Sequence, residues 1–99
     1  IMEITKMLTI STAHISEDTA KLLDKDQGTD CLGLSVYRKG RHGWFINVSA
    51  DVVQYIDTCE NIIPEELEKL IKFAVDLGCG MLCLDCDGEI LSYFEVYLW

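Results

Sequence analysis

The chain is short of proline, of basic residues and of long apolar runs, and each shortage excludes a class of protein. One proline in 99 residues, with 49% hydrophobic residues, excludes an intrinsically disordered chain. The unbroken apolar runs extend over only a few residues, too few to cross a bilayer, so no membrane partner is expected. Lys and Arg number 8 against 17 Asp and Glu, and the resulting net charge of -9 argues against direct binding of nucleic acid.

The N-terminus and the cysteines predict a cytoplasmic location. No basic segment followed by an apolar one is present, so we expect no secretory signal, and we take Met2 as the natural start. Five cysteines are an odd number, which favours reduced, buried thiols over a disulfide framework. Cys79, Cys83 and Cys86 invite a zinc interpretation. However, residues 83 and 86 fall in one expected strand and would point to opposite faces. Metal binding by these three cysteines stays open, and no cofactor is predicted.

Hydrophobic periodicity predicts a single domain over residues 1–99, with six elements and one added strand. We expect strands over 7–14, 31–38, 43–49 and 81–86, helices over 17–25 and 64–77, and a turn at 87–88 that leads into a further strand over 89–94. Residues 50–63 are interpreted as a connection. This order predicts an α+β fold with a mainly antiparallel sheet and both helices on one face, the split βαβ or ferredoxin-like arrangement. In that topology His14 lies near Met81 and not near Asp85.

Several segments resemble a small bacterial and phage family of domains of unknown function that is common on mobile elements. They are Ser-Thr-Ala-His-Ile over 11–15, Gly-Trp-Phe over 43–45, Pro-Glu-Glu-Leu over 64–67, Leu-Asp-Cys-Asp-Gly over 84–88 and Tyr-Leu-Trp over 97–99. The resemblance extends from Met7 to Trp99. It implies a mobile-element context and, by association, a role in conflict between phage and host, but no activity.

The distribution of charge leads to the first functional hypothesis. Residues 1–50 carry six acids and six bases, whereas residues 51–99 carry eleven acids against Lys69 and Lys72. We therefore expect a non-enzymatic binding protein, similar to an anti-CRISPR protein, that occupies a basic, nucleic-acid-handling surface on a host defence protein. Whether it is a monomer or a homodimer stays open. The residues expected to make this contact are Glu65, Glu66, Glu68, Asp76, Asp85, Asp87 and Glu89.

The alternative hypothesis is a small-molecule site at a basic end of the molecule. A nucleotide-like anion would be bound there by His14, Arg38 and Arg41, with Trp44 as a stacking surface. Catalysis is not expected, because no nucleophile, base and orienting group can be placed together from the sequence.

Overall fold

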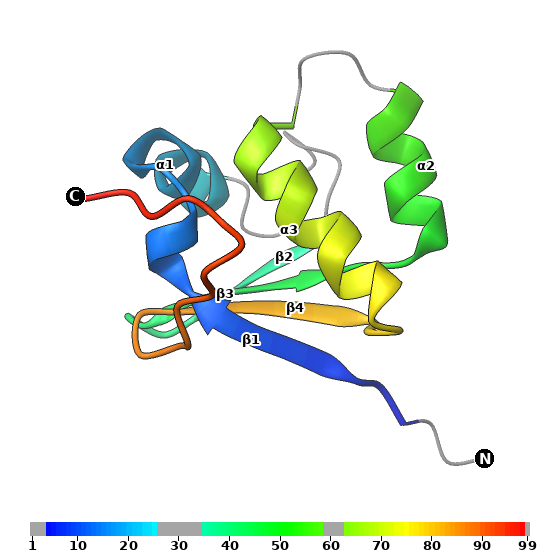
Figure 1. Cartoon of the computed structure of the whole chain (residues 1–99), viewed down its shortest axis with the longest axis horizontal. Coiled ribbons are helices and arrows are strands. Elements are labelled where there is room, and N and C mark those ends of the chain that lie inside the picture. The colour runs from blue at the N-terminus through cyan, green and yellow to red at the C-terminus, as the bar shows by residue number, and fades with distance from the viewer. Residues whose placement is uncertain (1–3, 26–34, 59–62, 99) are drawn as a thin grey trace.

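Four strands form one mixed sheet in the computed structural model, which describes residues 4–25, 35–58 and 63–98 (Figure 1). They are β1 (Met7–Ser11), β2 (Val36–Lys39), β3 (Gly43–Asn47) and β4 (Met81–Asp85), in the spatial order β1-β4-β3-β2. The pairs β2–β3 and β3–β4 are antiparallel, whereas β1 runs parallel to β4. The expected α+β class is confirmed, with a mixed sheet.

Three α-helices cover one face of this sheet. They are α1 (Glu17–Lys25), α2 (Ala50–Thr58) and α3 (Glu65–Asp76), and a short 3-10 helix, η1 (Thr12–His14), connects β1 to α1. In Figure 1 all three α-helices lie on the same side of the strands, with α3 across the middle. No helix within the described ranges is long and apolar enough to span a bilayer.

Local sequence signals explain where α1 and α3 begin and end. The Ser16 hydroxyl accepts a hydrogen bond from the amide of Thr19 (3.2 Å), which caps the first turn of α1 as expected. Pro64 stands immediately before α3, and three glutamates in its first turn face the positive end of the helix dipole. Gly78 takes the left-handed conformation (φ 81) that ends the helix.

The core lies between the sheet and the helices. Alternate strand residues point into it, among them Ile10, Ile46 and Leu84, each at most 1% exposed. The apolar stripe of α3 packs against them through Leu67, Leu70, Ile71 and Ala74. Burial of each large side chain stabilises the fold by about 1.5–3 kcal/mol, so this layer of contacts is a major favourable term.

The finer topology differs from the expectation in three places, and the ferredoxin-like order is not confirmed. The first strand ends at Ser11, and β1 lies at the sheet edge parallel to β4. Residues 50–58 form a regular helix. Residues 89–94 form no strand beyond a single bridge between Ile10 and Glu89, because this segment crosses η1 instead. The expected residues 31–34 of the second strand lie outside the described residues.

The parallel register also corrects the expected position of His14. Ser11, the last residue of β1, lies opposite Asp85 at the end of β4, whereas Met81 lies opposite Met7 at the other end. His14 therefore follows the strand end near Asp85. The error came from assuming an antiparallel neighbour, which would have reversed the two ends.

Candidate binding sites

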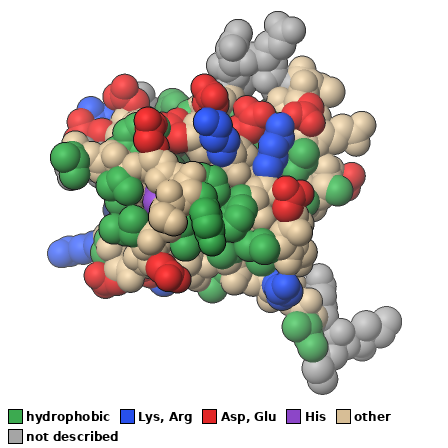
Figure 2. Space-filling view, viewed as in Figure 1, with side chains coloured by type: hydrophobic (Ala, Val, Ile, Leu, Met, Phe, Trp, Pro, Cys, Tyr) green, Lys and Arg blue, Asp and Glu red, His purple; other side chains and the backbone are tan. Residues whose placement is uncertain are grey.

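A groove of about 540 Å³ lies where the C-terminal segment crosses the beginning of α3. We call it the acidic groove, and its lining is His14, Glu65, Glu66, Lys69, Leu70, Tyr93, Phe94, Glu95 and Tyr97. Three carboxylates and three aromatic rings thus come from two segments that are distant in sequence. In Figure 2, red acidic side chains alternate with blue basic ones along one margin of the visible face, above a green apolar area.

His14 holds the C-terminal segment in place and is a structural residue. Its side chain is 1% exposed, and both ring nitrogens are used. Nδ1 lies 2.9 Å from the Glu95 carbonyl oxygen and Nε2 lies 2.9 Å from the Leu91 amide. A carbonyl only accepts and an amide only donates, so the ring carries its proton on Nδ1 and accepts at Nε2. It has no free nitrogen for a ligand.

Two more backbone bonds and an aromatic cluster complete this docking. The Ser11 amide donates to the Glu89 carbonyl (2.9 Å), and the Tyr97 amide donates to the Ala13 carbonyl (2.8 Å). The Phe94 ring meets the His14 ring edge to face, with centroids 5.7 Å apart. The segment therefore forms a fixed wall of the acidic groove.

The hydroxyl of Tyr97 is hydrogen-bonded to one of the groove carboxylates. The pKa of Tyr97 is raised to about 12, first by the hydrogen bond from its hydroxyl to the Glu95 carboxylate (2.9 Å). Burial and the charges of Glu66, Glu95 and Glu65 raise it further, because a phenolate would be repelled by those carboxylates. Within the groove, Glu65 pairs with Lys69 (3.4 Å), and Glu66 accepts a hydrogen bond from the Thr19 hydroxyl (3.0 Å).

The seven acids expected at the partner surface lie on α3 and on the segment at the end of β4. Glu65 and Glu66 line the acidic groove, and Glu68, in the same first turn of α3, binds Lys72 (2.8 Å). Asp76 ends α3, at the opposite end of that helix. The others lie at or after the end of β4: Asp85, paired with Lys39, then Asp87 and Glu89.

The basic residues of the alternative hypothesis lie around a second pocket, of about 430 Å³, without His14. This basic pocket is lined by Thr12, Glu17, Ala20, Lys21, Asp24, Arg38, Arg41, His42, Gly43, Trp44 and Cys86. The Arg38 guanidinium pairs with Asp24 and lies 5.7 Å from the centre of the Trp44 ring. Trp44 is 6% exposed and donates to Asp24 (3.1 Å), so most of its ring is buried in the core.

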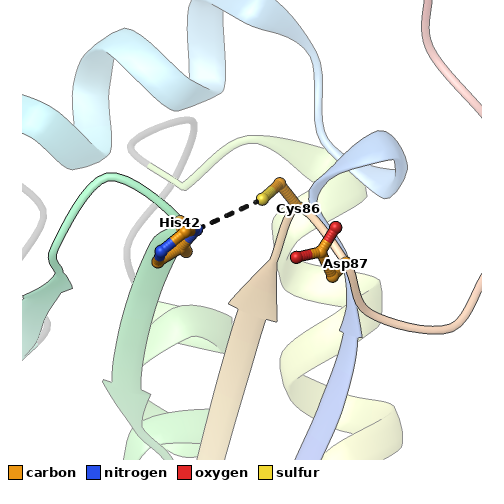
Figure 3. A group of neighbouring side chains, drawn as sticks. All are labelled: His42, Cys86 and Asp87. Carbon is orange, nitrogen blue, oxygen red and sulfur yellow. Dashed lines mark hydrogen bonds between the residues drawn. The ribbon is translucent and has the colours of Figure 1, made fainter.

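Cys79, Cys83 and Cys86, the cysteines that the structure describes, do not form one cluster, but Cys86 joins residues that the sequence had not grouped. Cys79 and Cys83 are buried, and Cys86 is exposed. The Cys86 thiol lies 3.7 Å from His42 Nδ1, beside the Asp87 carboxylate (Figure 3). Cys86 follows β4 in the turn, one residue beyond the end of the strand in which it was expected.

Lys39, Asp85 and the buried Cys83 influence one another's pKa values. The Lys39 ammonium, hydrogen-bonded to Asp85, holds the pKa of that carboxyl below its usual range. Burial raises the pKa of the Cys83 thiol, so this cysteine stays protonated and unreactive.

One family model matches residues 7–99, and it describes the C-terminal domain of a family of unknown function, DUF5983. No curated protein and no solved structure matches the chain.

Proposed function

The chain belongs to the DUF5983 family of unknown function, and we propose that it is a non-enzymatic binding protein. Membership of this family by itself implies no activity. Its acidic groove takes up a basic segment of a partner protein. The observation that carries this proposal is the convergence of Glu65, Glu66 and Glu95 with Tyr93 and other aromatic side chains in one groove.

This combination of groups suits lysine and arginine side chains. Carboxylates accept charge-assisted hydrogen bonds from guanidinium and ammonium groups, and exposed aromatic faces attract the same cations. Tyr93 is 74% exposed beside the groove, so its ring is accessible. The raised pKa of Tyr97 supports a negative potential there. The net charge of -9 adds a long-range attraction that speeds encounter with a basic partner.

Binding of a labelled peptide of alternating arginine and glycine, followed by fluorescence anisotropy, tests the groove. We expect binding that weakens steeply as salt rises from about 50 to about 500 mM, because exposed charges are screened. The double variant Glu65→Gln/Glu66→Gln should bind roughly tenfold or more weakly, since two charge-assisted contacts are lost.

The control for this experiment changes the same charge elsewhere. The double variant Asp76→Asn/Glu89→Gln also removes two negative charges, but from outside the groove. It should retain most of the affinity. Equal losses in the two double variants would show attraction by net charge alone and would refute a binding site at the groove.

The finer proposal names the origin and the partner. We propose that the chain comes from a phage or mobile element and acts in the cytoplasm as an inhibitor of a host defence protein. The groove carboxylates would replace nucleic acid phosphates on a basic surface of that protein. The support is the acidic charge and the family resemblance. When the immobilised chain captures proteins from a bacterial lysate, duplex DNA should displace them, and the variant Glu65→Gln/Glu66→Gln should not capture them. Retention of the captured proteins in either case would contradict this proposal.

A second candidate function, binding of a nucleotide-like anion, is favoured by the basic pocket. Arg41 lines it together with Lys21 and His42, although Arg38 is already paired with Asp24. A nucleotide that binds the folded chain must raise its melting temperature, so thermal unfolding with a panel of nucleotides tests this function. Arg41→Ala should abolish any shift, and the absence of a shift with every nucleotide would remove this candidate.

A further inference from the structure

We propose that His42, Cys86 and Asp87 bind a divalent transition-metal ion, with Zn²⁺ as the natural candidate. The site is separate from the acidic groove and does not depend on the proposed function. Among the described residues, these three form the one group of three or more His, Cys, Asp or Glu side chains whose potential ligand atoms converge.

The distances between the ligand atoms suit one shared ion. Cys86 Sγ and His42 Nδ1 lie 3.7 Å apart, and the ligand atoms of all three residues lie within 4.8 Å of one another. A tetrahedral zinc ion with ordinary Zn–S and Zn–N distances separates these two ligand atoms by about 3.5 Å. In Figure 3 the imidazole and the thiol point toward each other from neighbouring turns, with the carboxylate beside them.

The donor set selects the class of metal. A thiolate, an imidazole and a carboxylate are the ligands that zinc takes in proteins, whereas calcium and magnesium require oxygen ligands. Three protein ligands leave a fourth position for water or for another ligand. His42 and Cys86 also line the basic pocket, so that position would lie at the wall of a pocket containing Arg41.

Two hydrogen-bonded turns hold the ligands together without a metal. The Cys86 amide donates to the His42 carbonyl (2.7 Å), which joins the turn after β4 to the turn between β2 and β3. The Asp85 side chain accepts from the Asp87 amide (2.9 Å), and its carbonyl accepts from the Gly88 amide (2.9 Å). A Cβ at Gly88 would lie 2.4 Å from the Ile10 carbonyl carbon, so this turn is pressed against β1. Preorganised ligands reduce the ordering that binding requires.

Cobalt(II) titration of the full, reduced and metal-free chain tests the site. Thiolate ligation produces a charge-transfer absorption in the near ultraviolet, and tetrahedral geometry produces visible bands. We expect one cobalt per chain, displaced by Zn²⁺. Cys86→Ser should remove the charge-transfer band. His42→Ala and Asp87→Asn should each weaken binding by at least about tenfold, because even residues that only support metal ligands contribute that much.

Two control variants separate this site from other thiols and acids. Cys31→Ser/Cys59→Ser removes two cysteines outside the described residues and should leave the spectrum unchanged. Asp76→Asn removes an exposed carboxylate outside the cluster and should do the same. Zinc should also protect Cys86 from alkylation by iodoacetamide in the wild-type chain, as read by mass spectrometry.

Two outcomes would overturn the proposal. The first is a charge-transfer band that persists in Cys86→Ser, which would assign the metal to other cysteines. The second is no cobalt binding, together with alkylation of Cys86 that zinc does not slow. That result would show that His42 and Cys86 form a thiol–imidazole hydrogen bond only.

Discussion

Gly43→Ala is expected to destabilise the fold by about 3 kcal/mol or more, because β3 and β4 approach too closely there for a side chain. A Cβ at Gly43 would lie 1.6 Å from the Leu84 carbonyl oxygen and 2.7 Å from its carbonyl carbon. Both neighbours are backbone atoms, so neither can rotate away, and the strands must separate. In a domain of this size the loss corresponds to a fall in melting temperature of roughly 12–24 °C.

Gly40→Ala is the matched control for this variant. Gly40 lies in the turn that precedes Gly43 and has positive φ (53), but nothing lies within 4 Å of its missing Cβ. Alanine there should cost only about 1–2 kcal/mol, from the left-handed conformation. Urea unfolding measures both variants as a lower midpoint with unchanged slope. If Gly43→Ala cost no more than Gly40→Ala, the close approach of the strands would be refuted.

His14→Ala is expected to cost about 3 kcal/mol and to release the C-terminal segment from η1. The substitution leaves the Leu91 amide and the Glu95 carbonyl without their partners and opens a cavity beside Phe94. Hydrogen exchange of the Leu91 amide should therefore accelerate more than exchange in β4. The variant should also lose binding of the basic peptide, since the segment forms a wall of the acidic groove.

His42→Ala controls for the removal of a histidine. His42 is exposed, so without metal its loss should change stability by no more than about 0.5 kcal/mol. A Leu91 amide that stayed fully protected in His14→Ala would contradict the structural role assigned to this ring.

The elements that the sequence predicts well are those with local signals. Pro64, the first-turn glutamates and a four-residue apolar stripe place α3 almost to the residue. α2 is harder to predict from the sequence, because Ile56 is its one buried residue and its other apolar side chains are only partly buried. A signal was nevertheless present, since the Ser49 hydroxyl accepts from the Val52 amide (3.2 Å) as a helix cap does.

The pairing of β1 and both candidate sites depend on contacts between distant segments. No local pattern distinguishes a central first strand from an edge strand parallel to the last one, as β1 is to β4. The acidic groove requires the C-terminal segment to turn back over η1, where a hairpin strand was expected. His42 and Cys86 meet only because β3 and β4 pair antiparallel, with Gly43 opposite Asp85. That register becomes predictable only once the strand order is known.

The parallel pairing of β1 with β4 also has a consequence for synthesis on the ribosome. Met7 leaves the exit tunnel before β2, β3 and the helices, and its partner Met81 leaves only after them. Until then the edge of the nascent β1 has no native neighbour. The β2–β3 hairpin can form first, and α2 and α3 follow. β4 then inserts between β3 and β1. Completion of the sheet therefore waits until β4 has left the exit tunnel.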